Sequence, residues 1–264
     1  MSAHGALAVT LAFGIAVLTT PAGVSGAVLL LPVQVSVLGV PSPAVTPTNL
    51  LYNVIGTPGG LFHYWRAGAL RGDLARKLAL GTLPGVLVGA VIRVEYLAGP
   101  RRFLVVVALV LLPIGTWLAT MSRHEPERAA DRPPRLGRRG VFALALVVGV
   151  VGGVYGVGGG SILAPILLVC GYTVYDVAGA ALAATFVTSV VGVVAYQVLQ
   201  HRYGSDAIAP EWTLGVLMGA GGLVGSYAGA HLHRRIPEAI IRRSLGVIVL
   251  LIAVRYLLEG SGAM

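Results

Sequence analysis

GGVYGVGGGSILAP, residues 152–165, is the stretch from which the fold of this chain can be worked out. Six of its first nine residues are glycine, and apolar segments flank the run at 141–151 and 162–170. Because glycine adopts backbone conformations that are closed to other residues, such a run turns sharply and directs several N–H groups into one concavity. Ser161 follows the run, and we expect its hydroxyl to cap the helix that begins there. The stretch therefore predicts a sharp turn between two helices that offers backbone donors to an anion.

The composition of the chain places this turn in a membrane. Of the 264 residues, 56% are hydrophobic and 11% are charged, whereas soluble domains carry about 25% charged residues. Apolar stretches recur along the chain, and about 20 apolar residues span a hydrocarbon core of roughly 30 Å. We therefore predict an all-α fold, a polytopic helical membrane protein. The net charge of +9 comes from basic residues between the apolar stretches, which indicates cytoplasmic loops and no nucleic-acid partner.

Ten helical segments follow from the apolar pattern. They are expected at residues 5–20, 24–40, 43–65, 74–92, 102–120, 140–152, 161–172, 176–200, 211–232 and 240–258. The first of them resembles a signal-peptide core without its basic start, and we expect it to be retained as structure. Residues 121–139 form the only long polar stretch; its six arginines and three prolines predict a loop.

The parts before and after this loop resemble each other. GVSGAVLLLP (23–32) aligns with GVGGGSILAP (156–165), and the glycines at 81, 85 and 89 align with those at 221, 225 and 229. Asn53 then aligns with Thr185, and Thr57 with Ser189. These correspondences indicate a duplication, with residues 1–120 as the first transmembrane repeat, 121–139 as an Arg/Pro-rich linker and 140–264 as the second transmembrane repeat.

The distribution of charge predicts the topology. Of the 19 Lys and Arg residues, 14 lie within 65–77, 121–139 and 231–243. If these segments are cytoplasmic, each repeat makes three net crossings plus a returning hairpin (5–40 and 140–172), and both termini lie outside. An odd number of crossings turns the second repeat upside down relative to the first, as in many secondary transporters. The hairpin arms of about 12 to 17 residues leave re-entrant loops and short full crossings both open.

In this topology the glycine-rich turns of the two hairpins meet near the middle of the membrane. Each turn leads into a helix N-terminus, which carries a partial positive charge and unpaired N–H groups and therefore attracts anions. The competing interpretation is that the glycines only let helices pack closely; we adopt it for the glycines at 81, 85, 89, 221, 225 and 229. The candidate anion-binding residues of the turns are Gly23, Ser25, Gly26, Gly156, Gly158, Gly159, Gly160 and Ser161.

Polar side chains recur on the third helix of each repeat. Thr46, Asn49, Asn53 and Thr57 follow three- and four-residue steps, so they share one helix face. Such groups either line a substrate path or bond to neighbouring helices, and for any single residue we expect the two equally. The candidates from the polar faces and from the first hairpin arm are Gln34, Asn49, Asn53, Thr57, Thr185 and Ser189.

Enzymatic sites fit the sequence poorly. GVGGGS lacks the lysine of a phosphate loop, and a serine hydrolase at Ser161 would need a base, whereas no histidine lies in the middle of a predicted span. We expect no catalytic residue, no metal and no cofactor. The single Cys170 excludes an internal disulfide.

On these elements the chain resembles the sulfite exporter TauE/SafE family, also called toluene-sulfonate uptake permeases. The resemblance rests on the GxGGGxxxxP element at 156–165, its degenerate first copy ending at Pro32, the polar helix after each and the later Gly-x-x-x-Gly helices. It implies secondary transport of sulfite, or of an organosulfonate such as sulfoacetate, across the bacterial plasma membrane by alternating access. The implied partners are a small anion and the lipid bilayer; proton coupling and a homodimer stay open. The alternative class is a non-transporting membrane assembly subunit or an intramembrane enzyme.

Overall fold

The computed structural model describes residues 3–20, 24–68, 70, 73–120, 136–172, 174–232 and 238–261. Within these ranges the chain is helical and has no strand, which confirms the predicted all-α class. The ten α-helices found there are α1 (Ala3–Thr19), α2 (Ala27–Ser36), α3 (Val45–Arg66), α4 (Leu74–Glu95), α5 (Pro100–Thr120), α7 (Arg138–Tyr155), α8 (Gly160–Val169), α9 (Val174–Tyr203), α10 (Trp212–Leu232) and α11 (Glu238–Ser261). A short 3₁₀ helix, η2 (Asp206–Ile208), precedes α10.

The helices have the length and surface of a membrane protein. Five stretches of the described chain are long and apolar enough to cross a bilayer: Leu74–Glu95, Pro100–Trp117, Arg138–Tyr155, Val177–Tyr203 and Asp206–His231. Large apolar side chains also face outward, among them Leu251, Val147 and Val198, each more than 60% exposed. Because an apolar surface of this kind is unfavourable in water, it indicates contact with lipid. The chain is a multi-pass membrane protein.

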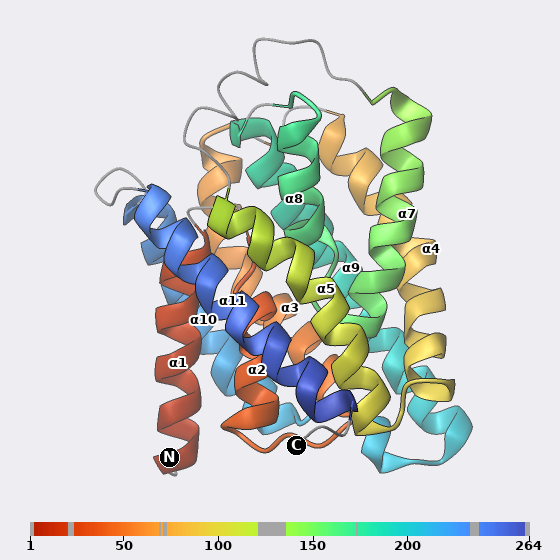
Figure 1. The fold of residues 1–264 in the computed structure, drawn as a ribbon. Helices are drawn as coiled ribbons and strands as arrows, with labels where there is room; N and C mark the ends of the chain where they lie inside the picture. The colour runs from red at the N-terminus through yellow and green to blue at the C-terminus, as the bar shows by residue number, and fades with distance from the viewer. Residues whose placement is uncertain are drawn as a thin grey trace.

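Helix contacts in one half of the chain have counterparts in the other. The counterparts emerge when α1 to α5 are compared in chain order with α7 to α11. Helix α4 packs on α7 as α10 packs on α1, and α4 packs on α9 as α10 packs on α3. Helices α3 and α9 contact each other, as do α5 and α11, which run side by side across the front of Figure 1. Corresponding helices such as α1 and α7 run in opposite directions in Figure 1.

The four-residue glycine pattern lies where these helices touch. A Cβ added to Gly85 would lie 2.3 Å from the carbonyl oxygen of Leu146 on α7. In the other half, a Cβ on Gly225 would lie 2.4 Å from the carbonyl oxygen of Phe13 on α1. Backbones this close tolerate no side chain, so the interpretation of these glycines as close-packing residues is confirmed.

Each hairpin pairs a long first arm with a short second arm. Helices α1 and α7 have 17 and 18 residues, whereas α2 and α8 have 10 each. At 1.5 Å per residue a ten-residue helix is about 15 Å long, half the thickness of the hydrocarbon core. The second arms expected at 24–40 and 161–172 were therefore predicted too long. The α1–α2 hairpin starts from the end of the molecule at which α11 ends, and α7–α8 starts from the opposite end (Figure 1).

Candidate functional site

The turns of the two hairpins are in direct contact. The backbone N–H of Ser25 donates to Ser161 Oγ at 2.9 Å, although the two residues are 136 positions apart. Close by, the Tyr155 hydroxyl donates to the carbonyl oxygen of Val28 at 2.9 Å. Ser25, Ser161 and Tyr155 are all buried. The centre of the molecule is thus built from both halves at once.

The second turn needs its glycines for two reasons. Gly156, Gly158 and Gly159 have φ angles of +83°, +71° and +80°, in the left-handed region that favours glycine. Gly160 has no room for a side chain, because a Cβ there would lie 1.9 Å from the carbonyl oxygen of Ala181 on α9. The turn therefore lies flat against α9 and leads directly into the N-terminus of α8.

Ser161 has a different role from the one expected. The N-cap of α8 is Gly159, and no side-chain hydrogen bond caps the helix, so the predicted capping role of Ser161 is wrong. Its hydroxyl instead accepts the Ser25 N–H of the other hairpin. The N–H groups of Gly158, Gly159 and Ser161 have no recorded acceptor in the described chain. The start of α8 therefore keeps donors for a ligand, as expected of a helix N-terminus.

Two hydroxyls of α9 face this turn without a partner. Thr185 Oγ1 and Ser189 Oγ are buried, and neither makes a hydrogen bond within the part of the chain that the structure describes. A Cβ on Gly160 would lie 2.3 Å from Thr185 Oγ1, and one on Gly158 would lie 2.7 Å from Ser189 Oγ. An unsatisfied buried hydroxyl costs about 1–3 kcal/mol. Two of them beside unpaired backbone donors form a polar cluster that a fold selected for stability alone would not retain.

Asn53 on α3 ties the two turns together. Its Oδ1 accepts the Ser25 hydroxyl, and its Nδ2 donates to the carbonyl oxygen of Gly156 at 3.3 Å. The side chain is fully buried. Because it bonds one residue from each hairpin, Asn53 fixes their relative position.

The first turn is less open to a ligand than expected. The Ser25 N–H is taken by Ser161, and the Ala27 N–H by Ser25 Oγ at 3.2 Å. Asn49 Nδ2 donates to the carbonyl oxygen of Ala27 at 2.9 Å, and Gln34 Nε2 donates to Asn49 Oδ1 at 2.9 Å. The N–H groups of Ser25 and Ala27 were predicted to be unpaired, but Ser161 Oγ and Ser25 Oγ accept them. Only Gln34 Oε1 lacks a partner in this network of described residues.

Of the three remaining candidates, two are buried and one lies outside the described residues. Thr57 is buried on α3, one turn beyond Asn53. Gly26 is buried against the hydroxyl of Tyr52. Gly23 lies outside the described residues. The described candidates therefore lie at the hairpin turns, on α2 and on the polar helices α3 and α9.

Sequence reasoning missed a charged residue next to this cluster. Arg93 on α4 is fully buried, and its Nε donates to Thr46 Oγ1 at 3.1 Å. A signal for it existed, since positions 81, 85, 89 and 93 continue one four-residue step along the buried face of α4. Arg93 is one of the five basic residues outside the three segments that the charge distribution assigns to the cytoplasm.

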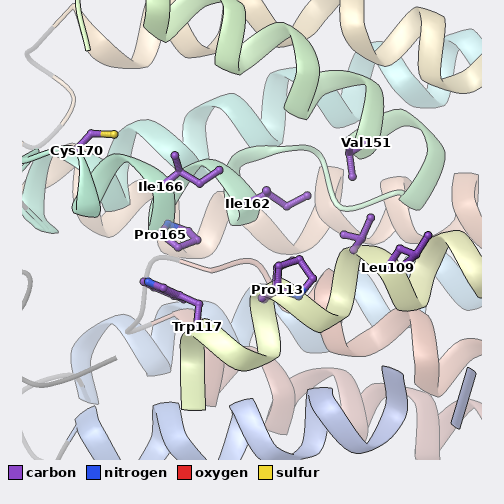
Figure 2. A pocket seen from close by; sticks show the side chains of 10 residues that line it. Leu109, Pro113, Trp117, Val151, Ile162, Pro165, Ile166 and Cys170 are labelled. Carbon is purple, nitrogen blue, oxygen red and sulfur yellow. The ribbon is translucent and has the colours of Figure 1, made fainter. Parts of the chain in front are cut away.

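A separate cavity of about 460 Å³ lies on the far side of α8 and is apolar. Figure 2 shows its lining, with Pro113 and Trp117 from α5 facing Ile162 and Pro165 from α8 and Cys170 just beyond that helix. It offers no set of converging polar groups, so it is not the anion site. Among the described residues no group of three or more His, Cys, Asp or Glu side chains is placed to hold a metal.

Comparison with known proteins gives one match. The family model described as "Sulfite exporter TauE/SafE" matches residues 8–256, a range that includes both turns and both polar helices. No curated protein and no solved structure matches the chain.

Proposed function

The chain belongs to the sulfite exporter TauE/SafE family of membrane transporters, and from this premise we propose that it is a secondary transporter of a small sulfur-containing anion. Sulfite and organosulfonates such as sulfoacetate are the expected substrates. Each presents several oxygens around one sulfur, so each needs hydrogen-bond donors that converge from more than one direction.

The observation that carries the proposal is the polar cluster between the second turn and α9. Thr185 Oγ1 and Ser189 Oγ are buried without partners, beside the unpaired N–H groups at the start of α8. In the proposal these groups bind the oxyanion directly, and the α8 N-terminus adds a partial positive charge. Ser25 and Asn53 hold the two turns in register around the anion.

Alternating access follows from the paired arrangement of the helices. In the proposal residues 1–120 and 140–264 are inverted repeats joined by the linker 121–139, and the halves rock about the contact between the hairpin turns. The matching helix contacts and the opposite directions of α1 and α7 support this. Because the site side chains are 0–5% exposed, an anion reaches them only when the halves move apart.

The proposed orientation has both termini outside and the linker in the cytoplasm of a bacterial cell. The start of α1 and the end of α11 lie toward the same end of the molecule in Figure 1, while α5 ends and α7 begins toward the other. A proton-coupling residue forms no part of the proposal, since no aspartate or glutamate is buried among the residues whose side chains the structure describes.

The test is anion flux in liposomes that contain only this protein. Radiolabelled sulfite and sulfonates are expected to enter faster than in empty vesicles. Ser189→Ala is expected to raise the KM at least about tenfold, because a hydrogen bond to a charged group contributes about 1.5–3 kcal/mol. Thr116→Ala is the control, since Thr116 is exposed on α5 and bonds only to the carbonyl oxygen of Leu112. Absence of flux for every small anion, with binding that requires a partner protein, would favour the assembly-subunit alternative.

A further inference from the structure

Arg93 is a buried cation with no carboxylate partner among the residues that the structure describes. Its guanidinium donates to Thr46 Oγ1 at 3.1 Å, to Ser42 Oγ at 2.6 Å and to the carbonyl oxygen of Leu97. Its Cζ also lies 3.8 Å from the centre of the Phe103 ring. All of these partners are neutral, and no ion pair to Arg93 is recorded within the described residues. The positive charge is therefore solvated by dipoles and a ring face, and it is not cancelled.

Retaining such a charge in a membrane helix is expensive. A buried charge normally has a partner of opposite sign, and an unpaired one costs several kcal/mol. Arg93 lies two residues before Glu95, the end of α4, and ionisable residues buried inside a helix bundle often serve the substrate. A residue of α4 that only had to pack could be apolar, like its buried neighbours Val86 and Ala90.

The charge is close to the second turn. Thr46 accepts from Arg93 and donates its own hydroxyl proton to the carbonyl oxygen of Val154 at 3.1 Å. The backbone of Thr46 also touches the turn itself, since a Cβ on Gly156 would lie 2.7 Å from the Thr46 carbonyl oxygen. From α9, the Tyr196 hydroxyl donates to Gly153 at 2.8 Å and secures the same end of α7. The Thr46 hydroxyl thus lies between the Arg93 guanidinium and the end of α7, which leads into the second turn.

We propose that Arg93 is a positioning residue that sets the charge preference of the transporter. It acts on the anion through space and does not touch it, and it favours dianions over monoanions of similar shape. The inference rests on the proposed function, because it concerns the same site.

The size of the effect follows from Coulomb's law. At a separation on the order of 10 Å and an effective dielectric constant of about 20, one unit charge on the ligand changes binding roughly 15-fold. The charge of Arg93 raises the affinity for a monoanionic sulfonate by this factor and the affinity for dianionic sulfite by the square of this factor. Removal of the charge is therefore expected to change the ratio of their KM values by roughly 15-fold.

The experiment measures KM for methanesulfonate and for sulfite at one alkaline pH, where sulfite is a dianion. Arg93→Gln is expected to raise both KM values and to raise that of sulfite roughly 15-fold more. Arg93→Lys keeps the charge but loses the forked geometry, so it is expected to keep the ratio of the wild type. A purely structural role of Arg93 would change both KM values by the same factor, and that result would overturn the inference.

A measurement on the wild type keeps the inference testable if Arg93→Gln does not fold. The unmodified protein is expected to bind the dianion more tightly than the monoanion, and equal affinity would overturn the role given to Arg93. Absence of any anion flux in the wild type would overturn the proposed function and this inference with it. Flux with an unchanged KM ratio in Arg93→Gln would overturn the inference alone.

Discussion

Thr185→Val tests two effects of one hydroxyl, on the stability of the anion-free protein and on the affinity for the anion. The change replaces the unpaired hydroxyl by a methyl group of similar shape and leaves the rest of α9 intact. Because Thr185 Oγ1 is buried without a partner, its removal is expected to stabilise the anion-free protein by about 1–3 kcal/mol. For a chain of this size that corresponds to a rise in melting temperature of about 2–4 °C per kcal/mol.

The same change is expected to weaken anion binding. A hydrogen bond to a charged group contributes about 1.5–3 kcal/mol, so the Kd rises at least about tenfold. An anion present at 100 times the wild-type Kd stabilises the wild type by about 2.7 kcal/mol. At the same concentration the variant gains only about 1.4 kcal/mol or less. The variant therefore melts higher without anion and shifts less when anion is added.

Thermal unfolding in detergent, with and without sulfite at one scan rate, measures both quantities. Thr116→Val is the matched control, because its hydroxyl is exposed on α5 and should change neither value. A lower melting temperature for Thr185→Val without anion would show that the hydroxyl has a structural partner. An undiminished shift on adding sulfite would refute its role in binding.

Two further substitutions test the framework around the site. Asn53→Ala removes the bonds to both hairpins and is expected to lower the free energy of unfolding by about 2–4 kcal/mol and to abolish flux; full stability in a melting assay would contradict its bridging role. Gly160→Ala places a Cβ 1.9 Å from the Ala181 carbonyl oxygen, so a loss of at least about 1–3 kcal/mol is expected. Its control, Gly14→Ala in α1, has no atom within 4 Å of the new Cβ and is expected to gain about 0.5–1 kcal/mol; the reverse order of stabilities would refute the packing argument.

The sequence was sufficient to predict the helices and the sharp glycine turn before α8. In a bilayer the backbone of a long apolar stretch satisfies its own hydrogen bonds by forming a helix, which is why the helices of the described residues could be predicted. A run of glycines also predicts positive φ angles, and Gly156 and Gly158 have them. The boundaries of α2 were less predictable, because the apolar residues Val24 and Leu38 belong to its flanking turns.

What the sequence left open was which polar groups would satisfy one another. In the first turn the Ala27 N–H bonds to the hydroxyl of Ser25, which stands where the second copy has glycine. The Ser161 hydroxyl bonds to Ser25 in the turn of the other hairpin and does not cap its own helix, so its role depends on where that turn lies. The burial of Arg93 likewise depends on contacts with Thr46 on α3 and with Ser42 in the loop before α3. Pairings of this kind come from tertiary structure, which a linear pattern does not encode.

The most direct test of the account is to locate a bound anion. Selenite has the charge and shape of sulfite, and its selenium can be identified in a crystal by anomalous scattering. The account predicts one selenite at the start of α8, with oxygens within about 3 Å of Thr185 Oγ1 and Ser189 Oγ. Selenite that is transported but found bound only elsewhere, with neither hydroxyl in contact with it, would contradict the account.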